Sequence, residues 1–171
     1  MDLMDKLDKK EIKEFFSKGW MTHDAMWLYL CMQELGTEKA NKINKEAVKS
    51  MAGIEIHRIL KLMGRGKDPI TAFNDLKEII DTGFKLIQPE FMKMHYEFPR
   101  KNVMRGGFDK CFAYEGVKRF GMVENYQCGI VIRIQSWLDS LCVRHDTVPE
   151  LDGCLMHKHG KCDIEFRFYL D

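Results

Sequence analysis

The C-terminal stretch that decides the predicted fold reads Gly153-Cys-Leu-Met-His-Lys-His-Gly-Lys-Cys-Asp-Ile-Glu-Phe-Arg-Phe-Tyr-Leu170. From position 162 onward, apolar and charged residues alternate, which is the period-two pattern of a half-buried strand. Glycine adopts positive φ without strain, so a two-residue turn fits at His159-Gly160 or at Gly160-Lys161. The stretch therefore predicts a β-hairpin with arms at 153–158 and 162–170.

Either turn leaves His157, His159 and Cys162 on the apolar face of this predicted hairpin. With the turn at His159-Gly160, the Cβ atoms of His157 and Cys162 lie about 5 Å apart across the strands. A buried imidazole costs several kcal/mol unless it is hydrogen-bonded or bound to metal. We therefore predict that His157 and Cys162 form one chemical unit, either a thiolate–imidazolium pair or part of a metal site. Two residues that merely pack on one sheet face are the alternative.

Length and composition predict one domain over residues 1–171, because 171 residues at 45% hydrophobic content can bury a core. The net charge of +1 gives no electrostatic argument for a nucleic acid or an anionic membrane as partner. The amino terminus is too charged for a signal peptide, and no apolar run approaches the roughly 20 residues that span a bilayer. We expect a cytoplasmic protein with six reduced cysteines.

Apolar periodicity, caps and glycines predict helices over most of the remaining chain. The predicted helices are 9–18, ended by Gly19; 23–35, capped by Thr22; 37–63; 70–87; 109–120; and 127–142. Residues 127–142 also contain β-branched residues that favour a strand, and we choose the helix because of the apolar spacing. Strict alternation predicts a strand at 91–98, and Arg105-Gly-Gly107 is interpreted as a loop. The predicted fold class is α+β, with about six helices on one face of a small antiparallel sheet that ends in the C-terminal hairpin.

Two helical residues are further candidates for a site. His23 lies in the first turn of a predicted helix, where the helix dipole favours the neutral ring, which can act as a ligand or a base. Glu55 lies beside the apolar stripe of the helix 37–63, so it is either buried with a perturbed charge or placed at the edge of the stripe. A histidine in the capping region and a solvated glutamate are the simpler interpretations.

The tail His159-Gly-Lys-Cys-Asp-Ile-Glu-Phe166 resembles the closing motif of the L-2-amino-thiazoline-4-carboxylate hydrolase-like family. The stretch 19–27 and the segment that contains Asn41, Asn44 and Glu55 resemble an uncharacterised bacterial family related to that hydrolase group. The resemblance implies hydrolysis of a C–N bond, other than a peptide bond, in a small cyclic amidine or amide. The motif itself matches only at four positions: Gly160, Cys162, Asp163 and Phe166.

Three functions therefore compete. In the first, a hydrolase-like enzyme uses Cys162, His157, Glu55 and His23 on a small-molecule substrate, with a thiol nucleophile. In its metal version, a transition metal such as Zn or Fe is held by His157, His159, Cys162 and His23. The second is a non-catalytic, sensor-like module that binds a small molecule or a metal in a Met-rich apolar pocket, and the third is a structural protein. The substrate and the oligomeric state stay open.

Overall fold

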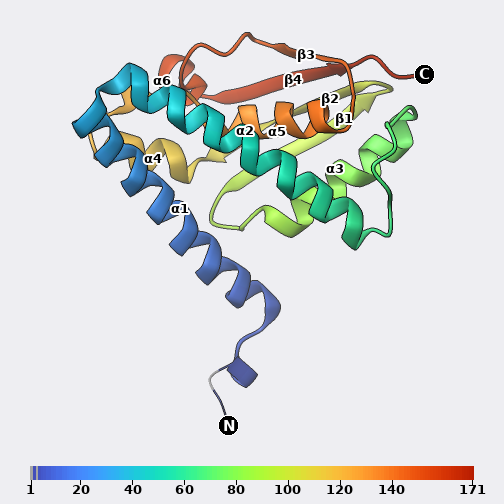
Figure 1. The fold of residues 1–171 in the computed structure, drawn as a ribbon, viewed down its shortest axis with the longest axis horizontal. Coiled ribbons are helices and arrows are strands. Elements are labelled where there is room, and N and C mark those ends of the chain that lie inside the picture. The colour runs from blue at the N-terminus through green and yellow to red at the C-terminus, as the bar shows by residue number, and fades with distance from the viewer. Residues whose placement is uncertain (1, 3) are drawn as a thin grey trace.

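The computed structural model describes residue 2 and residues 4–171 of the chain. The described residues form six α-helices, four strands and two short 3-10 helices (Figure 1). In chain order these are η1 (Met4–Lys6), α1 (Lys9–Leu35), α2 (Thr37–Leu62), α3 (Phe73–Ile87), β1 (Lys93–Arg100), β2 (Val103–Lys110), α4 (Phe112–Arg119), η2 (Val123–Asn125), α5 (Gly129–Ser140), β3 (His145–Val148), α6 (Leu155–His159) and β4 (Cys162–Phe168). The predicted α+β fold class is confirmed.

The sheet is antiparallel throughout, with strand order β1-β2-β4-β3. Its inner face packs on the helices, and side chains from α2, α3, α5 and β4 meet in one apolar core. The most deeply buried core side chains include Ile56, Leu76, Ile80, Trp137, Leu138 and Phe166, each at most 2% exposed. The predicted helices at 37–63 and 127–142 are confirmed as α2 and α5, and the strand at 91–98 as β1.

The central strand β2 contains the segment Arg105-Gly-Gly107, so the predicted loop at this position is wrong. Gly107 pairs with Asp163 in the β2–β4 ladder, and the two chains approach unusually closely there. A Cβ atom on Gly107 would lie 1.7 Å from the carbonyl oxygen of Cys162. The glycine therefore marks a close backbone approach inside a sheet, which is the other common meaning of glycine in a strand.

The predicted hairpin is corrected in its first arm, while its second arm is confirmed as β4. Residues 155–159 form α6, and Gly160, at φ 70°, is the left-handed C-cap of that helix. Glycine serves a helix C-cap as readily as a hairpin turn, because both need positive φ. The strand that pairs with β4 at this edge is β3, at 145–148, which lies outside the predicted hairpin.

Helix α1 continues through Gly19, so the predicted break into two helices is wrong. Its start is fixed by a capping box, in which Asp8 and Glu11 each bond the other's backbone N–H. A glycine inside a helix costs only about 1 kcal/mol relative to alanine. Continuous α1 reaches well beyond the body of the molecule at its amino-terminal end (Figure 1).

Candidate functional site

The predicted unit of His157 and Cys162 is not assembled. His157 lies on α6, where its Nε2 atom is 3.2 Å from Oε1 of Glu124. Cys162 begins β4 and pairs with Phe108 of β2 instead. Because α6 replaces the first hairpin arm, the two residues no longer face each other across a ladder. His159 is exposed at the end of α6.

Cys162 instead lines a small closed cavity with three other thiols. Cys111, Cys128 and Cys154, from three separate segments, complete the set around an apolar space of about 20 Å³. Cys111 is the N-cap of α4, Cys128 of α5 and Cys154 of α6. All six cysteines of the chain are free. Sequence spacing did not reveal this cluster, because its members are far apart in the chain.

Burial raises the pKa of both Cys111 and Cys162 to about 12, from an ordinary value of 9.0. Burial also raises the pKa of Cys128. A thiol nucleophile needs the opposite shift, because the thiolate is the reactive form. At neutral pH these three cysteines are therefore protonated, apolar packing groups.

We expect the raised thiol pKa values to make the fold sensitive to alkali. Between about pH 9 and pH 12 the unfolded chain ionises Cys111 and Cys162 while the folded chain keeps them protonated. The unfolded state then binds fewer protons, so the free energy of unfolding falls with pH by roughly 1.4 kcal/mol per unit for each thiol. Urea unfolding of the wild type and of Cys162→Ala, measured from pH 8 to 10.5, should show a shallower decline in the variant.

The same comparison with Cys142→Ser is the control, because the Cys142 side chain is exposed. Lysines and tyrosines are the same in all three proteins, so their contribution to the pH dependence of the free energy of unfolding cancels in the comparison. Identical slopes for wild type and Cys162→Ala would show that the thiol ionises equally in the folded and unfolded chains.

Glu55 is partly buried, with 18% of its side chain exposed. Both carboxylate oxygens accept hydrogen bonds from the Arg133 guanidinium of α5, with 2.8 Å between Nε and Oε2. The indole N–H of Trp137 donates to the same Oε2 atom at 3.0 Å. These bonds join α2 to α5 and satisfy the carboxylate, so its observed role is structural; a catalytic role for Glu55 stays a prediction.

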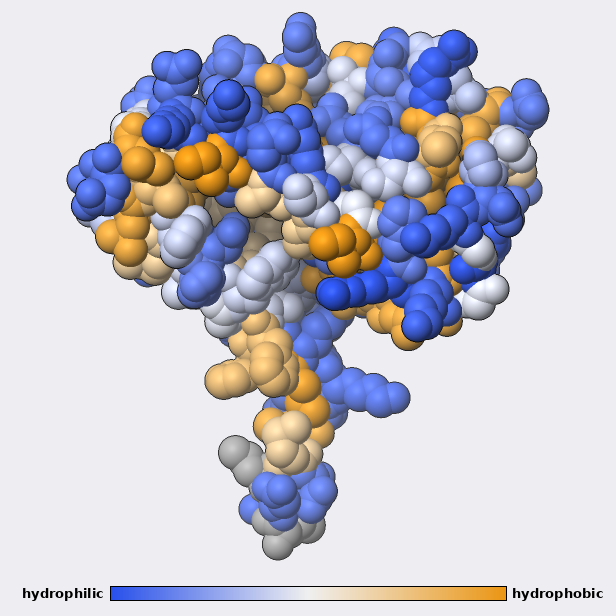
Figure 2. All heavy atoms as spheres, in the orientation of Figure 1, coloured by the Kyte–Doolittle hydropathy of each residue, from blue (hydrophilic) through white to orange (hydrophobic). Residues whose placement is uncertain are grey.

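His23 lies on α1, among large apolar side chains that are exposed. Its ring stacks on Trp27 with 6.5 Å between ring centroids. We define the α1 ridge as Phe15, Phe16, Trp20, Trp27 and Leu30, which are between 47% and 74% exposed. Figure 2 shows hydrophobic side chains gathered along this protruding helix.

Near its amino-terminal end, α1 contacts the last turn of α3 and the segment that follows it. The Lys10 ammonium pairs with the Glu90 carboxylate at 2.6 Å, and Glu14 accepts the backbone N–H of Glu90 at 2.5 Å. Lys13 donates to the carbonyl of Lys85 at 3.2 Å. These contacts tie the amino-terminal half of α1 to the body.

A groove of about 450 Å³ runs beside the α1 ridge, between α1, α2, α4 and α5. Trp20 and Trp27 line it from α1, and Met51 and Val48 from α2. The Arg133 guanidinium lies over the Trp20 ring, 5.2 Å from its centroid, so the ion pair with Glu55 also positions this tryptophan. The groove therefore extends the apolar surface of the ridge onto the body.

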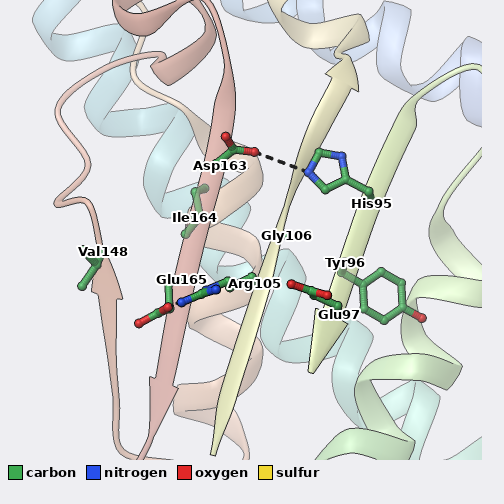
Figure 3. Close-up of a pocket in the computed structure, with 9 residues that line it drawn as sticks. All are labelled: His95, Tyr96, Glu97, Arg105, Gly106, Val148, Asp163, Ile164 and Glu165. Atoms are coloured by element: carbon green, nitrogen blue, oxygen red, sulfur yellow. Dashed lines mark hydrogen bonds and ion pairs between the residues drawn. The ribbon is translucent and has the colours of Figure 1, made fainter. Parts of the chain in front are cut away.

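The outer face of the sheet carries a second, shallow cleft of about 520 Å³. Figure 3 shows His95 of β1 pointing across β2 toward Asp163 of β4, and Nε2 of His95 is 3.4 Å from Oδ1 of Asp163. Beside them, Arg105 pairs with Glu165 at 2.7 Å. These polar side chains contact one another on the outer sheet face, which is how a solvated face is normally built.

The predicted metal ligands are not gathered. Within residue 2 and residues 4–171, no three His, Cys, Asp or Glu side chains are placed so that they could hold a metal ion. His23 lies on α1, His157 and His159 on α6, and Cys162 on β4. Nor does any helix in the part of the chain described here have the length and apolar character needed to cross a bilayer.

Comparisons with known proteins give two findings. A family model described as a family of unknown function, DUF6125, matches residues 4–90. A solved structure of trafficking protein particle complex subunit 3 from Naegleria fowleri, covalently bound to palmitic acid, is similar over 95% of this chain and 99% of that chain. Its TM-score is 0.50 and its sequence is 14% identical, so the likeness concerns the fold. No curated protein matches the sequence.

These findings correct the resemblance and the functions drawn from it. Neither match is to a hydrolase or to a bacterial hydrolase-like family, and the similar structure is a eukaryotic subunit of a protein complex. The expected hydrolysis of a cyclic amidine or amide is therefore withdrawn. So is the alternative of a sensor-like module that binds a small molecule or a metal, and with it the small molecule as the expected partner.

Proposed function

We propose that this chain, which belongs to the DUF6125 family of unknown function, is a non-catalytic subunit of a protein assembly. The observation that carries the proposal is the α1 ridge, an outward-facing row of large apolar side chains on a helix that leaves the body. The proposed role of the rest of the fold is to hold this helix in position for a protein partner.

The composition of the ridge favours a protein interface over an ordinary surface. Single exposed apolar residues are common, but a continuous row marks an interaction site. Tryptophan is the residue most enriched among side chains that dominate binding energy, and the ridge contains Trp20 and Trp27. Phe15 and Phe16 add a second aromatic pair, packed edge to face at 5.7 Å.

The anchoring of α1 supports the same proposal. A partner that binds a mobile helix must also order it, which reduces affinity. Here Lys10, Lys13 and Glu14 contact residues 85–90, and these contacts restrict the orientations of α1 before a partner binds.

The similar solved structure lends support at the level of fold only. That protein is a subunit of a trafficking protein particle complex. Fold alone does not determine function, so the proposed function of this chain depends on its own α1 ridge.

The proposal is tested by site-specific photo-crosslinking in intact cells. A benzophenone amino acid replaces Phe16 in the full chain, and Leu62 in a matched control. Leu62 is 76% exposed but stands at the end of α2, away from the ridge. We expect discrete protein adducts from position 16 and none above background from position 62.

Two outcomes would contradict the proposal. Adducts of equal yield from both positions would mean that the ridge is no more occupied than any exposed leucine. Adducts with lipid alone, or none at all, from position 16 would mean that the ridge does not face a protein.

A further inference from the structure

We infer that the partner on the α1 ridge is a second copy of this chain, with the two α1 helices packed side by side in antiparallel directions. This inference rests on the proposed function, because it names the occupant of the same surface. Three features of α1 support it: the spacing of its exposed apolar residues, the distribution of its charges and the area of its exposed face.

The spacing along α1 is that of a two-helix seam. Phe16, Trp20, His23, Trp27 and Leu30 follow one another at intervals of four, three, four and three residues. Apolar residues that repeat on average every 3.5 residues form the stripe along which two helices pack together. The row passes through Gly19 without interruption because α1 is continuous.

The charges of α1 favour pairing with itself in the antiparallel direction. Residues 9–22 contain four lysines and two glutamates, whereas residues 23–35 contain Asp24 and Glu34 and no lysine or arginine. In an antiparallel pair, the basic half of each helix lies against the acidic half of the other, and the two helix dipoles oppose each other. A parallel pair would place like charges together.

The same patch can serve both partners, as a two-fold interface requires. One antiparallel register brings aromatic residues together: Phe16 lies against Trp27 of the second copy, and Trp20 against His23 of the second copy. In this register Lys9 faces Glu34 of the second copy at each end of the pair.

The exposed area approaches that of a specific dimer. An aromatic side chain presents about 150–250 Å², so burying the exposed parts of Phe16, Trp20 and Trp27 in both copies removes on the order of 700 Å². Specific interfaces begin at about 1,000 Å². Leu30 and the groove beside Trp20 and Trp27 add to the buried area.

The first experiment measures mass in solution. Light scattering and sedimentation equilibrium of the purified full chain should give a dimer. Trp27→Glu should weaken it by roughly 100-fold or more, because it places a charge in the centre of the seam. Leu62→Glu, at an exposed leucine outside the ridge, should leave the dimer unchanged. Urea unfolding of each variant confirms that it is folded.

The second experiment tests the antiparallel register with a charge exchange. Lys9→Glu and Glu34→Lys should each weaken the homodimer, roughly tenfold at low salt, because each creates two like-charge pairs. Mixing the two variants should restore wild-type affinity, because every facing pair in the mixed dimer is again of opposite sign. Within one chain these residues are about 37 Å apart along α1, so no rescue can arise inside a monomer.

A monomeric wild type at 100 µM would overturn the inference, and so would a dimer that Trp27→Glu leaves intact. A dimer that Trp27→Glu disrupts but in which the mixed variants show no rescue would overturn the antiparallel arrangement. If the wild type is monomeric and photo-crosslinks from position 16 still reach another protein, the proposed function stands and only the second copy fails.

Discussion

Replacing Gly107 by alanine is expected to destabilise the fold by more than about 4 kcal/mol, or to prevent folding. The added Cβ would lie 1.7 Å from the carbonyl oxygen of Cys162, and the neighbouring contacts are also backbone atoms. Backbone in the middle of a ladder cannot rotate away as a side chain can. The strands β2 and β4 would have to separate, and the sheet would lose the pairing that joins its two halves. Circular dichroism and urea unfolding measure the effect.

Gly116→Ala is the matched control. Gly116 lies inside α4, and no atom lies within 4 Å of the position that its Cβ would take. Alanine favours the helix by about 1 kcal/mol relative to glycine, so this variant should be slightly more stable than the wild type. A folded Gly107→Ala protein within 1 kcal/mol of the wild type would show that the strands do not approach as closely as described.

The second large effect is expected from the ion pair that joins α2 to α5. Glu55→Leu leaves the Arg133 guanidinium and the Trp137 indole N–H without their acceptor in a largely enclosed place. Breaking such a pair by removing one partner costs about 3–5 kcal/mol, and we expect the lower end because 19% of the Arg133 side chain is exposed. The free energy of unfolding in urea is the measurement.

The double variant Glu55→Leu/Arg133→Leu should be less destabilised than the sum of the two single variants, because it leaves no charge unpaired. Glu46→Leu is the control: its pair with Lys49, at 2.9 Å, is exposed on α2, so its loss should cost less than about 1 kcal/mol. A loss in Glu55→Leu no larger than in Glu46→Leu would mean that the enclosed pair contributes nothing beyond a surface pair.

The sequence predicts the parts of the fold that have one strong local pattern. Residues 162–170 alternate cleanly, and β4 lies there; residues 37–63 carry a long apolar stripe, and α2 lies there. It fails where one residue type has two meanings. Gly107 suggests a loop but permits a close strand approach, and Gly160 suggests a hairpin turn but ends a helix. Only tertiary contacts decide between such meanings.

The α1 ridge was missed for a different reason. Phe15, Phe16, Trp27 and Leu30 all lie within the predicted helices 9–18 and 23–35, but one sequence does not say whether an apolar stripe faces its own core or another chain. The available signal was the regular spacing from Phe16 to Leu30, which crosses Gly19 without a change of phase. The sequence also contained a signal for the partner of Glu55, because Arg133 lies beside the apolar stripe of its own helix.

The topology of the sheet also sets the order in which this chain can fold as it is made. Residues 4–90 contain α1, α2 and α3, whereas all four strands come from residues 93–168. The first three helices therefore leave the ribosome before any strand exists to cover Ile56, Leu76 and Ile80. Strand β2 must then wait for β4, about 60 residues later in the chain, before the sheet can close. During synthesis the helices have an uncovered apolar face for several seconds, at about 5–20 residues per second, and such a face favours aggregation until the sheet covers it.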